Sequence, residues 1–252
     1  MKIAIYGIGG HMGTVLYNCI RGNGNDEVLC GIDKFADKTK YCVPVYNNCR
    51  EMGQNKPDVI IDFSVREAIY DYLPYAVKNK IPCVIATTGY NTEESTYIQN
   101  DAKLIPIFKT GNMSLGINVI LHLAKIGAQM LANKADIEII EQHHNQKVDA
   151  PSGTALMLAD GIKEVSPEKY NVYGRNGKTG KRDKNEIGLH SLRGGTVVGE
   201  HKVIFAGKNE NVVLSHSAAD RSVFAEGAIK AAIYLTEKTN GLFDMSDMIN
   251  GR

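Results

Sequence analysis

The feature that most constrains the fold is a glycine-rich turn between an apolar run and an amphipathic stretch. The apolar run covers residues 2–6, and the turn that follows it reads GIGGHMG. Three of its glycines stand three residues apart, at Gly7, Gly10 and Gly13, and Gly9 is additional. Beyond the turn, apolar residues recur with the period of a helix that packs one face on a sheet, at Met12, Val15, Leu16, Cys19 and Ile20. The segment therefore predicts a strand, a tight turn and a helix in direct succession.

A turn of this kind is suited to holding the phosphates of a dinucleotide. Gly7 permits the tight bend, and Gly13 lets the helix pack closely on the strand. Gly9 and Gly10 let backbone N–H groups approach a pyrophosphate at the positive end of the helix. Asp33 ends the next apolar run, where a carboxylate can accept hydrogen bonds from an adenosine ribose. These residues together favour a dinucleotide site over the simpler alternative, in which the glycines only serve a tight turn.

Two details of this site need comment, and the second bears on the choice of cofactor. The glycine spacing departs from GxGxxG, because Met12 stands where the last glycine would fall. Lys34 directly follows Asp33, and its cation can meet the additional phosphate of NADP, whereas the Asp33 carboxylate repels it. We therefore expect the chain to use both NADH and NADPH, with a preference for NADH.

The first hundred residues alternate short β-branched runs with helical stretches, which is typical of a parallel sheet covered on both faces. The runs lie at residues 2–6, 27–32, 58–63, 83–86 and 105–108. Ser64 and Glu67 match a capping box and predict a helix that starts there, with a kink at Pro74. This pattern predicts an α/β fold with a Rossmann-like doubly wound parallel sheet.

The pattern changes near residue 115, where we expect a second domain to begin. A helical stretch at 118–132 leads into an apolar run at 137–140. Further runs separated by turn signals are expected to form antiparallel hairpins, at 187–192, 196–198, 201–205 and 212–215. The stretch 222–238 is helical again and is expected to pack on the first domain. The predicted division is a dinucleotide-binding domain at 1–114, completed by 221–252, and an α+β domain with an open mixed sheet at 115–220, for substrate binding and oligomerisation.

Composition argues against several classes of partner. The 252 residues carry 29 basic and 28 acidic side chains, so no overall field holds nucleic acid or an anionic membrane. The five cysteines are not spaced as metal ligands and are interpreted as reduced thiols, and no apolar run approaches the ~18 residues of a membrane span. We therefore expect a cytoplasmic protein that binds neither nucleic acid nor membrane.

The segment EQHHNQKVDAPSGTA, residues 141–155, concentrates reactive side chains after a predicted strand. His143 and His144 can exchange protons near neutral pH, and Lys147 supplies a cation. The run Ser152, Gly153 and Thr154 places hydrogen-bond donors at the start of a predicted helix, which suits a carboxylate. Alternatively, the histidines end a strand and the SGT run only caps a helix. No metal is expected, because adjacent histidines project to opposite sides of a strand and no other ligand stands at suitable spacing.

The sequence resembles the dihydrodipicolinate reductase family over essentially the whole chain. The residues that carry the resemblance are GIGGHMG, DFS at 62–64, ATTG at 86–89, GNMS at 111–114, EQHHNQKVDAPSGTA and RGGTVVGEH at 193–201. The resemblance implies reduction of a cyclic dicarboxylate, 4-hydroxy-tetrahydrodipicolinate, to tetrahydrodipicolinate in lysine and diaminopimelate biosynthesis. It also implies hydride transfer from NADH or NADPH, and a homotetramer built through the open sheet.

The resemblance further implies roles for individual residues. His143 would be the general acid or base, and Lys147 the proton donor and cation near the substrate ring nitrogen. Ser152, Gly153 and Thr154 would hold one carboxylate, with His144 nearby. The cofactor would be held by the glycine turn and by His11, Met12, Asp33, Lys34, Phe63, Ser64, Thr87, Thr88, Gly89, Gly111, Asn112 and Met113. Two positions depart from the family pattern, which commonly has glycine at Ala86 and phenylalanine at Met113.

Other interpretations remain open at this point. Arg193 is interpreted as a surface residue beside a hairpin turn, with a direct role in the site as the alternative. A different Rossmann-type reductase of a small anionic substrate would be expected to carry a nucleophilic cysteine or a lysine–tyrosine pair. A dinucleotide-binding redox sensor without catalytic activity would leave the cluster from His143 to Thr154 unexplained.

Overall fold

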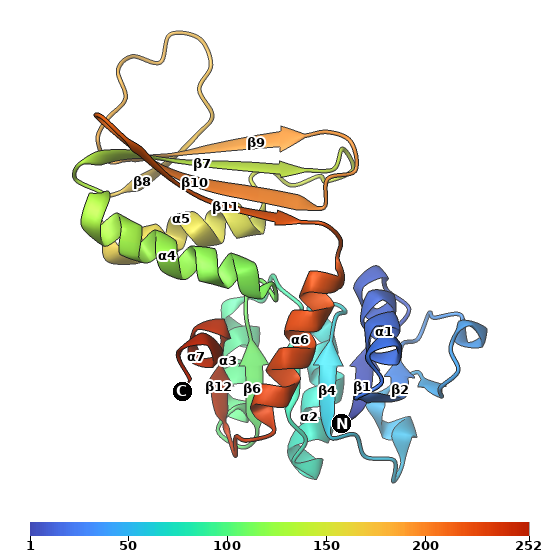
Figure 1. Ribbon diagram of the computed structural model, residues 1–252. Coiled ribbons are helices and arrows are strands. Elements are labelled where there is room, and N and C mark those ends of the chain that lie inside the picture. Colours follow the sequence, from blue (N-terminus) through green and yellow to red (C-terminus); the bar gives the residue numbers. More distant parts are fainter. Residues whose placement is uncertain (252) are drawn as a thin grey trace. The chain divides into compact units, whose positions relative to one another are not determined.

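The computed structural model describes residues 1–251, which form two compact units (Figure 1). The first unit comprises Met1–Ser114 together with the C-terminal segment that begins at Arg221, and the second is Leu115–Asp220. No helix in residues 1–251 is long and apolar enough to cross a membrane. Each unit has its own sheet and its own core.

The first unit is built on a seven-stranded sheet in which every neighbouring pair is parallel. In spatial order the strands are β12 (Gly241–Phe243), β6 (Pro106–Lys109), β5 (Cys83–Ile85), β4 (Val59–Asp62), β1 (Lys2–Tyr6), β2 (Glu27–Ile32) and β3 (Val45–Tyr46). The chain order reverses between β1 and β4, and ligands of open α/β sheets bind at the carboxyl ends of strands beside such a reversal. The predicted doubly wound parallel sheet is confirmed.

Helices cover both faces of this sheet because successive strand residues point to opposite sides. Ile3 and Ile5 of β1 share a core with α1 (His11–Asn23), α6 (Ser222–Leu235) and α7 (Met245–Asn250). Ala4, between them, belongs to a second core with α2 (Ile69–Asn79) and α3 (Thr92–Asp101). Three short 3₁₀ helices complete the unit, at Lys38–Lys40, Cys49–Met52 and Arg66–Ala68.

The predicted helix start at Ser64 is wrong. Ser64 does not cap a helix, because its hydroxyl donates to the carboxylate of Asp62 instead. The segment Arg66–Ala68 is a single 3₁₀ turn, α2 begins only at Ile69, and α2 continues through Pro74.

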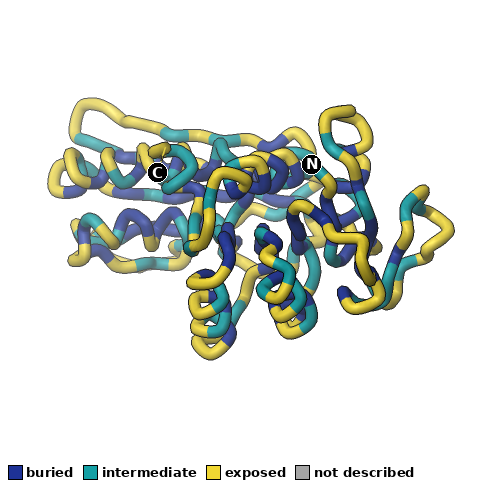
Figure 2. Tube along the Cα trace, turned by 90° about the horizontal axis from the view of Figure 1, so that it is seen from below, coloured by how far each residue is buried: buried dark blue, intermediate teal, exposed yellow. Residues whose placement is uncertain are grey.

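The second unit pairs a mixed five-stranded sheet with two helices. In spatial order the strands are β11 (Asn211–Ala218), β10 (Gly199–Gly207), β7 (Ala135–His143), β9 (Glu186–Arg193) and β8 (Tyr170–Tyr173). The helices are α4 (Leu115–Leu131) and α5 (Gly153–Val165). Their apolar faces pack on one face of the sheet, where β7 contributes Ile137 and Ile139. Along the helices of both units, buried residues recur from turn to turn and exposed residues lie between them (Figure 2).

The prediction that this sheet consists of antiparallel hairpins is only partly right. β10 pairs antiparallel with β11 and with β7, but β9 lies on the other side of β7 and runs parallel to it, and β8 runs parallel to β9. Residues 196–198, predicted as a strand, lie in the connection between β9 and β10. The mixed sheet itself, predicted as part of the fold class, is confirmed.

Candidate active site

The glycine turn of the first unit needs glycine for steric reasons. Gly7 has a positive φ of 78°, and its carbonyl accepts a hydrogen bond of 3.0 Å from Gly10 N–H. A Cβ at Gly13 would lie 2.0 Å from the Gly7 oxygen, so the helix can approach the turn only without a side chain there. Gly10 precedes α1 and offers no side-chain cap. The start of α1 is therefore a positively polarised helix end without a side-chain cap, as a bound phosphate requires.

Asp33 lies directly after β2 and braces this turn. Its carboxylate accepts hydrogen bonds from the backbone N–H groups of Gly9 at 3.0 Å, Phe35 at 2.8 Å and Ala36 at 3.1 Å. A carboxylate has about four lone-pair sites, so ribose hydroxyl groups can still donate to it. Lys34 is exposed beside it. The structure thus gives Asp33 a local structural contact in addition to its expected role.

A cavity of about 420 Å³ lies at the carboxyl ends of β4 and β5. It brings together five residues predicted for the cofactor, Met12, Phe63, Ser64, Thr87 and Thr88, and it is also lined by Val65, Arg66, Glu67 and Ala86. Gly89, in the same loop as Thr88, has a φ of 83°. The glycine turn, the uncapped helix start and this cavity fit a dinucleotide.

Like Gly89, four other predicted cofactor residues do not line this cavity. Met113 is buried in the core, and its carbonyl would lie 1.8 Å from a Cβ at Gly227 of α6. Asn112 accepts a hydrogen bond from Ser114 N–H at 2.8 Å, and Gly111 is exposed in the same loop. His11 is exposed at the start of α1, where its Nε2 lies 2.7 Å from Nη1 of Arg221.

Asp62, which the sequence analysis did not single out, ends β4 with its side chain completely buried beside this cavity. Burial raises its pKa to about 6, although hydrogen bonds from Ser64, Thr87 and Tyr72 oppose the shift. The Ser64 hydroxyl donates to Asp62, and Ser64 N–H donates to Thr87 Oγ1 at 3.0 Å. Asp62 therefore anchors two of the loops that line the cavity.

In the second unit, the end of β7 carries a buried polar cluster. Glu141 and His143 are two residues apart and face the same side of the strand, where the residues are 1% and 8% exposed. The Glu141 carboxylate lies 2.5 Å from His143 Nδ1 and accepts from Ser152 N–H at 3.1 Å. Arg193, at the end of β9, donates to both carboxylate oxygens, at 2.8 and 2.9 Å. One carboxylate thus joins β7, β9 and the start of α5.

Burial and charge set the protonation of this cluster. Burial alone would raise the pKa of Glu141, but hydrogen bonds from Arg193, Ser191, His143 and Ser152 outweigh it and hold the pKa at about 2. Burial lowers the pKa of His143; Lys147 and Arg193 act in the same direction and Glu141 opposes them. The cluster therefore contains an ionised carboxylate beside an imidazole with a lowered pKa.

The loop after β7 holds the remaining predicted residues. The ammonium group of Lys147 lies 2.9 Å from Asp149 Oδ1, and its backbone N–H donates to the His144 carbonyl at 3.2 Å. His144 follows the last residue of β7 and is half-buried. The loop thus places a lysine cation within four residues of the buried imidazole.

Helix α5 begins where the loop ends. Its N-cap is Ser152, whose hydroxyl accepts from Ala155 N–H at 3.2 Å and lies 3.1 Å from His201 Nε2. Gly153 is exposed at the first helical position and Thr154 is half-buried. This positively polarised helix end suits a carboxylate.

The sequence analysis missed two members of this cluster, Glu141 and His201, and gave Arg193 a role in the site only as the alternative. Glu141 was named only as the first residue of the segment, although its spacing from His143 already places both on one strand face. Arg193 is not a surface residue of a hairpin, because it ends β9 in register with His143. His201 comes from β10, where burial lowers its pKa to about 4 and its ring meets that of His143 edge to face at 5.2 Å. No local signal identifies these last two, since strand pairing brings them to the cluster.

Two family models together match nearly the whole chain. Residues 1–113 match the family described as "Dihydrodipicolinate reductase, N-terminus" and residues 116–249 match its C-terminal counterpart. The chain is 50% identical over 250 residues to a 4-hydroxy-tetrahydrodipicolinate reductase of Caldanaerobacter subterraneus, covering 99% of this chain and 98% of the relative. It is 45% identical to the Clostridium tetani protein of the same name, covering 99% and 97%.

Solved structures show the same fold. A dipicolinate-bound dihydrodipicolinate reductase from Paenisporosarcina sp. TG-14 superposes with a TM-score of 0.81 at 26% identity and covers 97% of both chains. An amine dehydrogenase from Mycobacterium smegmatis, at 9% identity and a TM-score of 0.65, shares the fold alone. With both parts of the family matched and full-length relatives at up to half identity, the chain belongs to the dihydrodipicolinate reductase family.

Proposed function

We propose that the chain reduces 4-hydroxy-tetrahydrodipicolinate to tetrahydrodipicolinate with NADH or NADPH, as an oxidoreductase of lysine and diaminopimelate biosynthesis. The relatives of that name match over the whole chain, and one solved member holds dipicolinate, a planar cyclic dicarboxylate. The observation that carries the proposal is the cluster at the end of β7. There the Glu141 carboxylate contacts the buried imidazole of His143, and the loop that follows β7 carries Lys147 and leads to the start of α5 at Ser152.

The residues of the first unit would hold the cofactor. The glycine turn and the uncapped start of α1 would bind the pyrophosphate, and Asp33 the adenosine ribose. The cavity-lining residues Met12, Phe63, Ser64, Thr87 and Thr88 would bind the nicotinamide end together with Gly89. His11, Gly111, Asn112 and Met113 do not line the cavity, and their role in cofactor binding stays a prediction. When bound, the dinucleotide supplies the hydride.

The residues of the second unit would bind the substrate and move the proton. The start of α5, with Ser152, Gly153 and Thr154, would hold one carboxylate, with His144 nearby. His143 would exchange a proton at Nε2, because Nδ1 is held by Glu141. Lys147 would stabilise the charge that develops on the ring as it gains a hydride, an interaction that is stronger in the transition state than in the ground state.

Turnover of two variants tests this assignment. NADH oxidation is followed by absorbance, with the substrate generated in the cuvette by the preceding synthase and with pyridine-2,6-dicarboxylate as a planar inhibitor. His143→Gln should lose about 10²–10⁴-fold in kcat, the usual contribution of a proton carrier. Lys147→Ala should lose turnover far more than NADH affinity. The matched controls are His122→Gln and Lys178→Ala, both at exposed positions, which should keep the wild-type rate.

Two results would overturn the assignment. Near-normal turnover of His143→Gln would remove this residue as the proton carrier. If Lys147→Ala lost only NADH affinity, the lysine would belong to the cofactor site instead.

The preference for NADH is a separate proposal that depends on Asp33. Its carboxylate is fixed by three backbone N–H groups, so it remains where the additional phosphate of NADP would lie. Michaelis constants for the two cofactors test this, and a hundredfold preference for NADPH would refute it.

We also propose a homotetramer that works in the cytoplasm. Support comes from the face of the second sheet opposite α4 and α5, where Ile140, Leu192, Ile204 and Val213 share one side. Leu192 and Val213 are about half exposed, at 50% and 51%, and such a face is stabilised when another subunit covers it. Light scattering should give four times the chain mass of 27.6 kDa, and a monomer would contradict the proposal.

A further inference from the structure

The Glu141 carboxylate is more deeply buried than the histidine that it contacts. Only 1% of its side chain is exposed, and a buried carboxylate is unfavourable unless it is paired and fully hydrogen-bonded. Here Arg193 forms two parallel hydrogen bonds to it, and Ser152 N–H adds a third. The oxygen that faces Arg193 Nη1 also lies 2.5 Å from Nδ1 of His143. The geometry of this pair therefore determines where the imidazole is held.

Arg193 is itself held in place at the end of β9. Its guanidinium donates to the carbonyls of Leu192 at 2.7 Å and Asp149 at 2.6 Å, besides its two bonds to Glu141. Asp149 also pairs with Lys147 through its side chain, at 2.9 Å. A planar guanidinium with several fixed acceptors has little freedom to turn. Arg193 thus connects the carboxylate that holds His143 to the loop that carries Lys147.

The two ring nitrogens of His143 have different surroundings. An ionised carboxylate only accepts hydrogen bonds, so neutral His143 carries its proton at Nδ1 and leaves the lone pair at Nε2. Gly199 of β10 stands beside Nε2, and a Cβ there would come within 3.1 Å of it. The absence of a side chain at Gly199 leaves room at the nitrogen that must reach a substrate.

Four groups with titratable or charged side chains face His143 from the elements around it. Glu141 lies on its own strand, Arg193 on β9, His201 on β10 and Lys147 on the following loop. Glu141 favours the imidazolium, whereas Arg193 and Lys147 disfavour it, in addition to burial. His201 approaches edge to face, and burial lowers its own pKa to about 4. Arg193 therefore offsets the attraction that an unpaired Glu141 would exert on the His143 proton.

We propose that Glu141 and Arg193 act as a positioning pair, which holds the His143 ring with Nδ1 protonated and Nε2 free for the substrate. The proposal rests on the proposed function only in taking His143 as the proton carrier. Neither residue needs to touch the substrate, because both act through the imidazole. The pair also keeps the loop with Lys147 in register with His143, through Asp149.

Removing either partner should perturb His143 in opposite directions. Glu141→Gln removes the attraction, so the acid limb of the kcat–pH profile should move to lower pH. Arg193→Met leaves Glu141 unpaired, so the same limb should move to higher pH. Both should lower kcat, by up to about 10⁴-fold for loss of the carboxylate that fixes the tautomer of a catalytic histidine, with the KM for NADH unchanged. Arg193→Lys keeps the charge but not the two parallel bonds, and should recover part of the lost turnover.

A readout without activity comes from NMR of protein labelled with ¹⁵N at histidine. The His143 signal is identified by its loss in His143→Gln. In the wild type it should show the Nδ1-protonated tautomer at neutral pH, and in Glu141→Gln a mixture of both tautomers. An Nε2-protonated ring in the wild type would overturn the proposal. So would pH profiles that shift in the same direction in Glu141→Gln and Arg193→Met.

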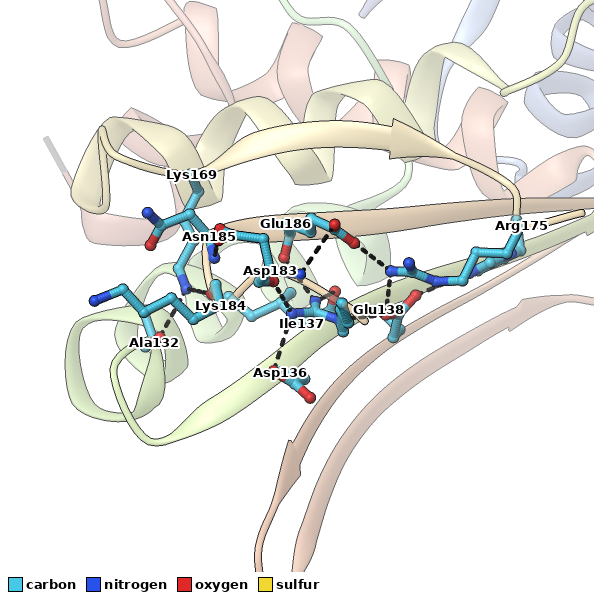
Figure 3. Close-up of polar contacts among 12 residues, drawn as sticks. Ala132, Asp136, Ile137, Glu138, Lys169, Arg175, Asp183, Lys184, Asn185 and Glu186 are labelled. Atoms are coloured by element: carbon cyan, nitrogen blue, oxygen red, sulfur yellow. Dashed lines mark hydrogen bonds and ion pairs between the residues drawn. The ribbon is translucent and has the colours of Figure 1, made fainter. Parts of the chain in front are cut away.

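The same strand supplies a matched control. Glu138, three residues earlier on β7, is on the opposite face and pairs with Arg182 at 3.0 Å and His190 at 2.8 Å, a similar set of side chains. Figure 3 shows Glu138 near Arg175 and Glu186 in this second network. Glu138→Gln should lower thermal stability while leaving the pH profile and the His143 signal unchanged. If it reproduced the effects of Glu141→Gln, the Glu141 pair would be merely structural.

The outcomes separate the two proposals. Normal turnover in His143→Gln would refute the assignment of the proton carrier. Loss of turnover in His143→Gln with normal turnover in Glu141→Gln would refute only the positioning pair. Circular dichroism shows whether each variant is folded.

Discussion

Asp62→Asn tests whether the carboxyl of Asp62, buried beside the cavity, has a raised pKa. The substitution removes the buried charge while keeping the shape of the side chain. Burial raises the pKa of Asp62 from 3.8 to about 6. A carboxyl whose pKa is higher in the folded state stabilises the protein fully below pH 3.8, and this stabilisation is lost as the pH rises through 6. Each pKa unit is worth about 1.36 kcal/mol, so the full effect is about 3 kcal/mol. About 2 kcal/mol of it falls between about pH 4.5 and pH 8.

The free energy of unfolding is measured by urea denaturation of the wild type and Asp62→Asn across this pH range. Because other groups titrate as well, the informative quantity is the difference between the two proteins. Asp62→Asn should gain about 2 kcal/mol relative to the wild type from about pH 4.5 to pH 8, and the gain should level off above about pH 6. A difference that stays constant within about 0.5 kcal/mol would refute a buried carboxyl with a raised pKa.

A second variant tests what sets the pH at which this gain levels off. The Tyr72 hydroxyl donates to Asp62 Oδ2 at 3.3 Å and so stabilises its ionised form. Tyr72→Phe removes this bond, raises the pKa of Asp62 further, and should move the levelling-off to higher pH. A shift to lower pH would show that the bond does not favour the carboxylate.

Three further predictions follow from other parts of the chain. Gly13→Ala should abolish NADH binding in calorimetry, because its Cβ would lie 2.0 Å from the Gly7 oxygen, whereas Gly22→Ala on the same helix meets nothing within 4 Å and should bind normally. Lys169 donates to two backbone carbonyls at 2.7 and 2.8 Å, so Lys169→Met should lower the free energy of unfolding, measured in urea, by about 2–3 kcal/mol. A loss below about 0.5 kcal/mol would contradict this. The stabilisation from ionised Glu141 is present above pH 4.5 and is lost as the pH falls toward its pKa of about 2. The free energy of unfolding of Glu141→Gln should therefore fall less in acid than that of the wild type, and an equal fall would contradict this.

The first unit could be predicted from sequence because its signals are local. The strand at 2–6, the glycine turn and the helix behind it are encoded within about 20 consecutive residues by period and turn chemistry. The same holds for the alternation of strands and helices up to residue 109, except that the two-residue strand β3 (Val45–Tyr46) was not predicted. Ser64 shows the limit of such reasoning, because a buried carboxylate two residues earlier takes the hydroxyl that the capping pattern assigned to a helix.

The second unit was harder because its pairing is not local. Turn signals between residues 187 and 215 favour hairpins, yet β9 pairs with β7 from about 50 residues earlier in the chain, and β10 lies on the other side of β7. This register brings Arg193 to His143 and His201 to Ser152. His143 and Lys147 could be predicted because they stand in one short segment, whereas their partners come from separate strands.

Helix α6 has a consequence for how the chain folds as it is synthesised. The core of the first unit requires Ala225, Ala228 and Ala232 of α6 against Ile3 and Ile5, more than 200 residues apart. The core of the second unit draws only on residues between 120 and 205, with Leu214 packed against it. On the ribosome we therefore expect the middle of the chain to reach its native packing first, while one apolar face of the N-terminal sheet is covered only in part, by α1, until α6 has left the exit tunnel.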